Sequence, residues 1–167
     1  LALYFRDETD RRRAEEGIRR LAAVAEQSSD FIGIFTPDAG GSDLNPAGRR
    51  MAGLDDRTNI AAWRIIDFFP REDRPFVRDH VMAALTGGAA EWEGELRLDQ
   101  PEGHEPIPVY FKGFAVRDAD GHNIGLATIT RDITAQKRSE DELRRVAADL
   151  SEADHRKSEF LATLAHE

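Results

Sequence analysis

The chain contains no cysteine among its 167 residues, which excludes disulfide bonds, thiolate metal sites and flavin photochemistry that proceeds through a cysteine adduct. Aromatic residues make up only 8% of the chain, as expected for one modest core flanked by solvated helices. No apolar run approaches the ~20 residues of a membrane-spanning helix, and the start lacks a signal peptide's apolar segment. We therefore expect a cytoplasmic chain without membrane contact, whose parent protein carries any membrane anchor upstream.

Positive charge is also scarce, because the formal net charge is −9. Such a chain should be repelled by nucleic acid and by anionic membranes. The one dense basic cluster, at Arg11, Arg12, Arg13, Arg19 and Arg20, is interleaved with acidic residues. This alternation is typical of a solvated helix face, so we expect no nucleic-acid partner.

An internal repeat sets the predicted domain boundaries. Residues 1–20 and 126–145 are identical at nine positions with an offset of 125, and both read as a strand end, an Asp-x-Thr corner and a charged helix. Such self-similarity indicates a repeated unit. We predict that residues 1–27 hold the last strand of a preceding unit (1–6) and a linker helix, that 28–134 form the folded domain, and that 135–167 form a coiled-coil helix.

The central region predicts an α+β fold. Alternating apolar residues and Gly or Pro turn signals mark the strands, and apolar residues three and four apart mark the helices. The expected strands are 30–36, 42–46, 91–98, 107–117 and 124–130, and the expected helices are 47–52 and 76–86. Two strands, short helices and three further strands predict a five-stranded antiparallel sheet with helices on one face.

The C-terminal helix carries a heptad seam. Its positions are Leu143, Val146, Leu150, Ala153, Lys157, Phe160 and Leu164. Alternating spacings of three and four are typical of a helix that pairs with a copy of itself. A weaker seam, at Ala14, Ile18, Leu21, Ala25 and Ser28, follows the N-terminal helix. We predict a homodimer through both helices, in which the seam charge of Lys157 keeps the pairing metastable.

The chain ends in SEFLATLAHE. His166 lies off the seam, on the helix face of Ala162 and Thr163. A neutral imidazole is a competent nucleophile, and the carboxylate of Glu167 beside it could hold or accept its proton. The alternative is a surface His and Glu pair near a frayed terminus.

SEFLATLAHE resembles the phosphoacceptor box of sensor histidine kinases, whose F-L-A-x-x-x-H-E helix takes phosphate from ATP. The resemblance implies that His166 is the phosphoacceptor and Glu167 its acid/base neighbour. It also implies a parent kinase that uses ATP and Mg and passes phosphate to a response regulator receiver domain. No Gly-rich nucleotide loop exists in these residues, so the chain alone should be inactive.

The order of elements over residues 28–134 resembles a PAS domain. Four segments carry the resemblance: Leu44-Asn45-Pro46-Ala47, Arg71-Glu72-Asp73-Arg74-Pro75, Gly87-Gly88 before Trp92-Glu93-Gly94-Glu95, and Arg131-Asp132-Ile133-Thr134. The resemblance implies that Asp132 and Thr134 lock the last strand to the outgoing helix and pass a signal on. Helix capping is the alternative role for these two residues.

A PAS core can enclose a small-molecule ligand, and apolar residues define the candidate pocket. They are Ile34, Trp63, Ile65, Phe69, Val81, Met82, Phe111, Phe114 and Ile129. The alternative is a core filled by its own side chains, as close packing favours. Haem on His80 or a redox flavin would make a sensor of another kind, although no residue set demands either. The histidines show no metal-ligand spacing, so we expect no metal site.

The resulting hypothesis is a sensory module of a two-component histidine kinase, with a ligand-free dimerisation module or a haem or flavin sensor as alternatives.

Overall fold

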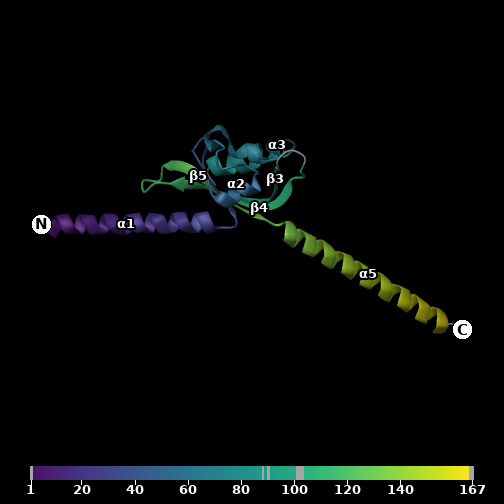
Figure 1. Cartoon of the computed structure of the whole chain (residues 1–167). Helices are drawn as coiled ribbons and strands as arrows, with labels where there is room; N and C mark the ends of the chain where they lie inside the picture. Colours follow the sequence, from purple (N-terminus) through teal and green to yellow (C-terminus); the bar gives the residue numbers. More distant parts are fainter. Residues whose placement is uncertain (1, 88, 90, 101–103, 166–167) are drawn as a thin grey trace. The chain divides into compact units, whose positions relative to one another are not determined.

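The structure is a computed structural model that describes residues 2–87, 89, 91–100 and 104–165 (Figure 1). Within these ranges, side chains are described from residue 11 onward, except those of residues 160 and 162–165. Contacts between residues divide the chain into an N-terminal unit, Leu1–Asp132, and a C-terminal unit, Ile133–Glu167.

The N-terminal unit contains the predicted five-stranded antiparallel sheet. Its strands are β1 (Phe31–Phe35), β2 (Gly41–Leu44), β3 (Glu91–Leu98), β4 (Ile107–Arg117) and β5 (Asn123–Asp132). They lie in the order β2-β1-β5-β4-β3, so β5 at the centre joins the first hairpin to the last strands. The predicted α+β class is confirmed.

Short helical segments between β2 and β3 cover one face of the sheet (Figure 1). They are α2 (Pro46–Met51), the 3-10 turns η1 (Ile60–Ala62) and η2 (Ile65–Phe68), α3 (Arg74–Phe76), the π-helical turn η3 (Val77–Met82) and α4 (Ala83–Thr86). Val77, Val81 and Leu85 are at most 1% exposed and anchor the last of these segments to the sheet. The neighbouring Phe76 is 46% exposed, because it lies about 100° around the helix from Val77.

The chain begins with α1 (Ala2–Gln27) and ends with α5 (Thr134–Ala165). The prediction of a strand over residues 1–6 is wrong, since residues 2–6 belong to α1. A lone strand leaves its backbone groups unpaired, whereas a helix satisfies them within the segment. Within the described part of the chain, no helix is both long and apolar enough to cross a membrane.

Candidate functional site

The core between the sheet and the helical layer is filled by its own side chains. Ile65, Phe69 and Phe111, all expected in the pocket, line an internal cavity of about 10 Å³. A cavity of that size holds about one water molecule. Haem or flavin therefore does not fit this core without repacking of the aromatic side chains.

Thr128 on β5 points its hydroxyl into this apolar cavity. Its side chain is 1% exposed, and its Oγ1 has no hydrogen-bond partner in the described part of the chain. We expect Thr128→Val to raise the free energy of unfolding by about 1 kcal/mol, because valine keeps the shape and removes an unsatisfied buried hydroxyl. Chemical denaturation measures this. Thr36→Val is the control, and it should lower the free energy of unfolding, since the Thr36 hydroxyl donates to Asp38 Oδ1 at 2.6 Å. A destabilised Thr128→Val variant would contradict the prediction.

Three of the expected pocket residues lie on the other face of the sheet. Ile34 is 49% exposed and Ile129 is 41% exposed. Phe114, opposite Ala127 in the register, shares this outer face. Side chains alternate along a strand, so Phe114 lies on the face opposite Phe111, three residues away. Placing these three residues in the pocket was therefore wrong.

The remaining expected residues lie outside the internal cavity. Val81 is fully buried beneath the helical layer, and Met82 lines a separate surface hollow with Arg64. His80 is exposed and stacks on the Phe76 ring, with 4.5 Å between the ring centroids. Its Nδ1 lies 3.2 Å from the Phe76 carbonyl oxygen, so its ring does not face the core.

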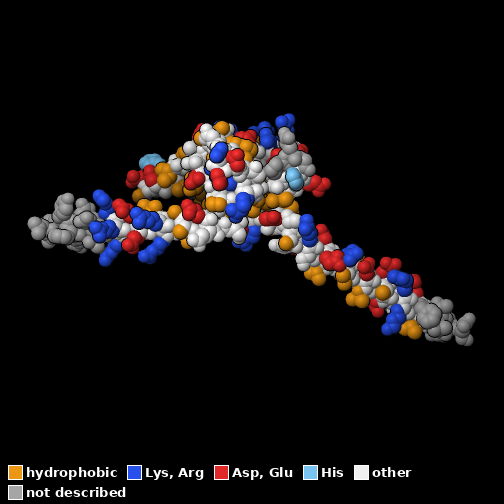
Figure 2. Space-filling model, in the orientation of Figure 1, with side chains coloured by type: hydrophobic (Ala, Val, Ile, Leu, Met, Phe, Trp, Pro, Cys, Tyr) orange, Lys and Arg blue, Asp and Glu red, His pale blue; other side chains and the backbone are white. Residues whose placement is uncertain are grey.

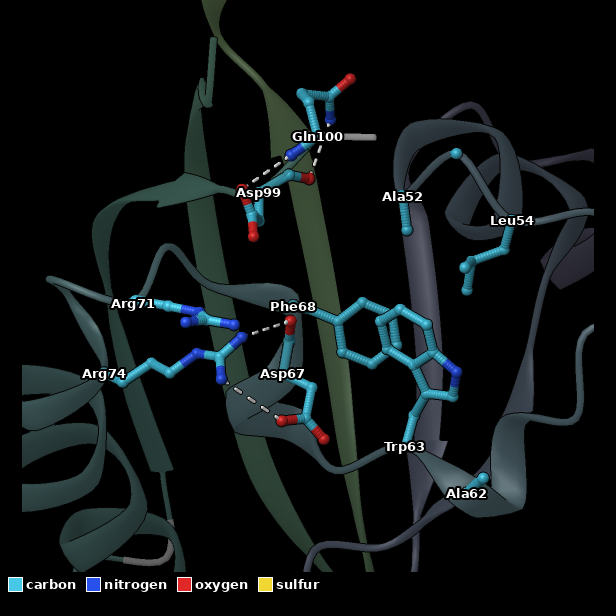
Figure 3. A pocket seen from close by; sticks show the side chains of 11 residues that line it. Ala52, Leu54, Ala62, Trp63, Asp67, Phe68, Arg71, Arg74, Asp99 and Gln100 are labelled. Atoms are coloured by element: carbon cyan, nitrogen blue, oxygen red, sulfur yellow. Dashed lines mark hydrogen bonds and ion pairs between the residues drawn. The ribbon is translucent and has the colours of Figure 1, made fainter. Parts of the chain in front are cut away.

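A larger cavity of about 550 Å³, which we call the outer pocket, opens at the surface of the helical layer (Figure 3). Its lining comes from the loop after α2, from η1 and η2, from the segment between η2 and the first residue of α3, and from the segment after β3. The lining residues are Ala52, Gly53, Leu54, Ala62, Trp63, Asp67, Phe68, Arg71, Arg74, Asp99 and Gln100. Only Trp63 belongs to the set expected from the sequence.

Aromatic rings form one side of the outer pocket. The Trp63 and Phe68 rings lie 5.3 Å apart at an interplanar angle of 31°. Phe68 is 4% exposed, whereas Trp63 is half-buried and offers part of its indole to the pocket. The Gly41 amide donates to the Trp63 carbonyl oxygen at 2.7 Å, which fixes this residue against β2.

Arginine side chains lie across the pocket from these rings (Figure 3). Arg74 is held in place: its Nε donates to the Phe69 carbonyl at 3.0 Å, and its guanidinium lies 3.7 Å from Asp67 Oδ1. Asp67 Oδ2 also accepts the Arg64 amide at 2.8 Å. Arg71 is exposed and makes no hydrogen bond or ion pair with the described residues.

The segment after β3 supplies an unneutralised carboxylate. Asp99 is half-buried, and its Oδ1 accepts the Gln100 amide at 3.1 Å. Its own amide donates to the Phe68 carbonyl at 2.9 Å, which ties the segment to the aromatic side. No cation pairs with Asp99 among the described residues. The Gln100 side chain donates to the Met51 carbonyl at 2.6 Å and thereby joins β3 to α2.

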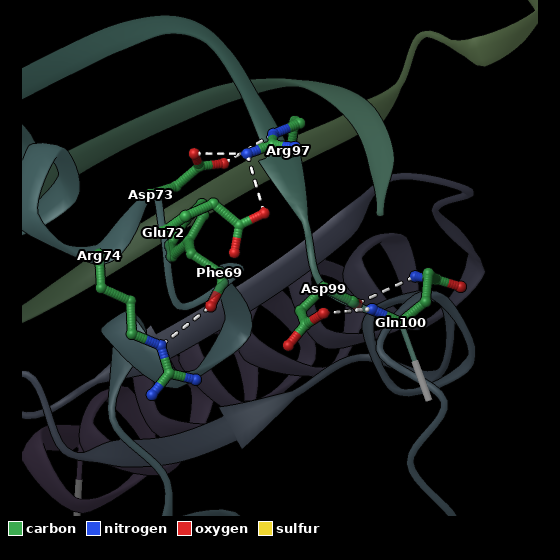
Figure 4. Close-up of polar contacts among 7 residues, drawn as sticks. All are labelled: Phe69, Glu72, Asp73, Arg74, Arg97, Asp99 and Gln100. Atoms are coloured by element: carbon green, nitrogen blue, oxygen red, sulfur yellow. Dashed lines mark hydrogen bonds and ion pairs between the residues drawn. The ribbon is translucent and has the colours of Figure 1, made fainter. Parts of the chain in front are cut away.

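An ion-pair network holds the arginine-bearing loop to the sheet (Figure 4). Arg97 on β3 donates to both carboxylate oxygens of Asp73 at 2.7 and 2.8 Å, and to Glu72 at 3.2 Å. These hydrogen bonds, chiefly those to Asp73, raise the pKa of Arg97 above its ordinary value. The segment from Arg71 to Arg74 is therefore anchored to β3 through the two residues that lie between these arginines.

Asn45 links the entry of the domain to its core. It is 8% exposed, and its Oδ1 accepts the amides of Ile32 at 2.9 Å and Gly48 at 2.8 Å. Its Nδ2 donates to the carbonyls of Ala25 in α1 and Asp30, each at 2.9 Å. The expected helix start at Asn45-Pro46 is present, and the same side chain also fastens α1 to the domain.

The two ends of the domain are tied by an ion pair. Arg131 near the end of β5 donates to both oxygens of Asp30 before β1, at 2.8 and 3.1 Å. These bonds raise the pKa of Arg131. Among the predicted relay residues, Asp132 is the last residue of β5 and Thr134 the first of α5. Their relay role stays a prediction.

His166 and Glu167, the predicted phosphoacceptor and its neighbour, lie outside the described residues. The seam before them is described as far as Lys157. Leu143, Val146 and Leu150 are 67%, 52% and 70% exposed in the single chain, and Figure 2 shows hydrophobic side chains along one edge of α5.

The hairpin turn between β4 and β5 brings Asp118, Asp120 and His122 within metal-ligand reach of one another. The sequence expectation that His122 lacks partners at such spacing was therefore wrong. All three residues are exposed, and His122 Nδ1 lies 3.3 Å from Asp118 Oδ2. Exposed groups of this kind are common without an ion, and we assign no metal site here.

Comparison with known proteins identifies the fold. No curated protein matches the chain significantly. Among solved structures, a PAS domain from Colwellia psychrerythraea superposes with a TM-score of 0.63 at 19% identity, covering 71% of this chain and 98% of that one. A sensory box histidine kinase/response regulator from Burkholderia thailandensis gives a TM-score of 0.57 at 22% identity, covering 80% and 98%.

A domain of a sensory box sensor histidine kinase/response regulator from Geobacter sulfurreducens gives a TM-score of 0.56 at 21% identity, covering 70% of this chain and 94% of that one. The sequence model of the PAS fold matches residues 25–138, which is more than half of the chain. The expected sheet, helical layer and boundary motifs lie within this range. The chain therefore belongs to the PAS-fold family.

Proposed function

We propose that this chain is the sensory module of a two-component sensor histidine kinase, in which a signal at the PAS domain passes through paired α5 helices to His166. The observation that carries the proposal is the arrangement along α5. The helix starts just after the last strand of the sheet, carries an exposed apolar heptad stripe from Leu143 onward, and the chain continues into SEFLATLAHE.

The exposed stripe supports pairing with a second copy of the chain. Leu143, Val146 and Leu150 lie at heptad spacing and are each more than half exposed. On α1, Ile18 and Leu21 are 67% and 73% exposed. Apolar stripes on otherwise charged helices are typical of coiled-coil seams. We therefore infer a homodimer formed through both helices.

The contacts at the ends of the domain suggest how the signal travels. Asn45 connects the end of α1 to β1 and α2, and the Asp30 and Arg131 pair connects the start of β1 to the end of β5. Asp132 and Thr134 then lead into α5. A change in the domain would reach both helices through these few contacts and shift the helix pairing.

The catalytic step belongs to the parent kinase. Its ATP-binding domain would bring ATP and Mg to the neutral imidazole of His166, which attacks the terminal phosphorus while Glu167 holds or accepts the imidazole proton. The phosphoryl group leaves ADP, forms a bond to the imidazole nitrogen and then passes to a response regulator receiver domain in the cytoplasm.

Replacement of His166 with glutamine in the parent kinase tests this proposal. We expect the His166→Gln variant to lose ATP-dependent phosphohistidine completely, because glutamine offers no nucleophilic ring nitrogen. His155→Gln is the matched control, since His155 is an exposed histidine on the same helix and lies 3.3 Å from Glu159. Phosphohistidine that persists without His166, or that disappears with His155, would refute the assignment.

A second candidate is a PAS module that only holds two chains together. The 10 Å³ core cavity favours it, because a domain without internal space for a ligand is sufficient for dimerisation. This candidate predicts that no added small molecule changes phosphorylation of His166 in the parent kinase. A monomer in sedimentation experiments at high protein concentration would contradict both candidates.

A further inference from the structure

The outer pocket presents opposite charges that the described residues do not neutralise. Among the described residues, Arg71 has no hydrogen-bond or ion-pair partner, and Asp99 uses one carboxylate oxygen for the Gln100 amide and is in no ion pair. Arg74 and Asp67, by contrast, already contact each other and nearby backbone groups. The pocket therefore offers one positive and one negative group to a ligand.

The position of Asp99 is unfavourable for an unpaired carboxylate in the ligand-free chain. The residue is half-buried, and a carboxylate that leaves water without a counter-charge loses hydration energy. Figure 3 shows its carboxylate directed toward the guanidinium of Arg71, although no ion pair joins them. A compact group that carries both an ammonium and a carboxylate would satisfy both side chains at once.

The rest of the pocket suits an apolar body. Trp63 and Phe68 form a tilted aromatic pair, and Leu54 extends the apolar lining from the loop after α2. The cavity volume of about 550 Å³ lies within the range of small-molecule sites. Charged and amide side chains form the other side of the pocket, and polar groups placed opposite an apolar side can orient a small ligand.

We propose that the outer pocket binds a free α-amino acid with a large apolar or aromatic side chain. Arg71 pairs with its carboxylate, Asp99 accepts hydrogen bonds from its ammonium, and Trp63 and Phe68 contact its side chain. The ligand brings the Arg71 loop, the aromatic pair and the end of β3 together. This site lies outside the core cavity, so its occupation requires no repacking of the core.

Isothermal titration of the 167-residue chain with four probes tests the proposal. The probes are L-phenylalanine, phenethylamine without the carboxylate, 3-phenylpropionate without the ammonium, and glycine without the apolar body. We expect L-phenylalanine to bind at least about tenfold more tightly than each of the other three, because each lacks one matched contact. Equal affinity for 3-phenylpropionate or phenethylamine, or no saturable binding of L-phenylalanine, overturns the proposal.

Two conservative substitutions assign the roles. Arg71→Gln should weaken L-phenylalanine binding at least about tenfold and leave phenethylamine unchanged, since only the carboxylate contact is lost. Asp99→Asn keeps the oxygen that accepts the Gln100 amide; it should weaken L-phenylalanine similarly and leave 3-phenylpropionate unchanged. Arg57→Gln and Asp120→Asn are matched exposed controls and should change nothing. Equal losses for all probes in either pocket variant contradict the assigned roles.

The inference rests on the proposed sensory function for its biological meaning, but binding is measured without a kinase domain. Failure of L-phenylalanine to bind overturns the pocket assignment and leaves phosphorylation of His166 untouched. Persistent phosphohistidine in the His166→Gln parent kinase overturns the relay and leaves the binding result intact. The two failures are therefore distinguishable.

Discussion

Replacing Asn45 with alanine is expected to lower the free energy of unfolding by about 3 kcal/mol, because it removes one hydrogen-bond partner from each of four backbone groups that are buried or partly buried. The amides of Ile32 and Gly48 lose their acceptor, and the carbonyls of Ala25 and Asp30 lose a donor. Chemical denaturation measures the loss. Faster hydrogen exchange at the Ile32 and Gly48 amides would locate it.

Two further variants separate the roles of Asn45. Asn59→Ala is the matched control, because Asn59 is an exposed cap whose side chain accepts the Ala61 amide at 3.1 Å and makes no other hydrogen bond with the described residues. Losing this cap should lower the free energy of unfolding by no more than about 1 kcal/mol. Asn45→Asp keeps both accepted bonds but sets a carboxylate against two carbonyls, so it should loosen the α1 contact first. Equal losses in Asn45→Ala and Asn59→Ala would contradict this assignment.

Local patterns in the sequence predict the sheet well. The alternation from Glu91 to Leu98 and the apolar run from Ile107 to Arg117 give β3 and β4 with the bounds that the structure shows. Alternation fixes which residues share a face, but not which face is covered. Ile34 and Phe114 were therefore taken for core residues although they lie on the outer face.

The outer pocket could not be predicted in the same way. Trp63, Arg71 and Asp99 come from three separate segments, and no spacing between them signals a shared site. Their meeting depends on long-range contacts, such as the bond from the Gln100 side chain to the Met51 carbonyl. The one signal that the sequence offered was an acidic residue directly after a predicted strand, and it acquires meaning only when the structure places it near an arginine.

The first hairpin requires a glycine for a steric reason. The residue with a positive φ in its turn is Ala39, at 67°, and not one of the two glycines that follow. Gly41 instead meets a steric requirement, because η1 packs directly against the start of β2. A Cβ at this position would overlap the Ile60 carbonyl oxygen and lie 2.6 Å from Ile60 Cγ2.

Gly41→Ala should therefore destabilise the domain by about 3 kcal/mol, since the backbone of η1 cannot yield without losing other contacts. The Gly41 amide also holds the Trp63 carbonyl, so the displaced turn would move the indole that lines the outer pocket. Chemical denaturation followed by tryptophan fluorescence measures both effects. Gly40→Ala is the adjacent control: its Cβ would meet only side-chain atoms, Thr36 Oγ1 at 3.0 Å and Asp38 Oδ1 at 3.9 Å, and no backbone atom among the described residues. Its expected effect is below about 1 kcal/mol. If Gly41→Ala unfolds no more easily than Gly40→Ala, close contact between η1 and β2 is not what requires glycine at this position.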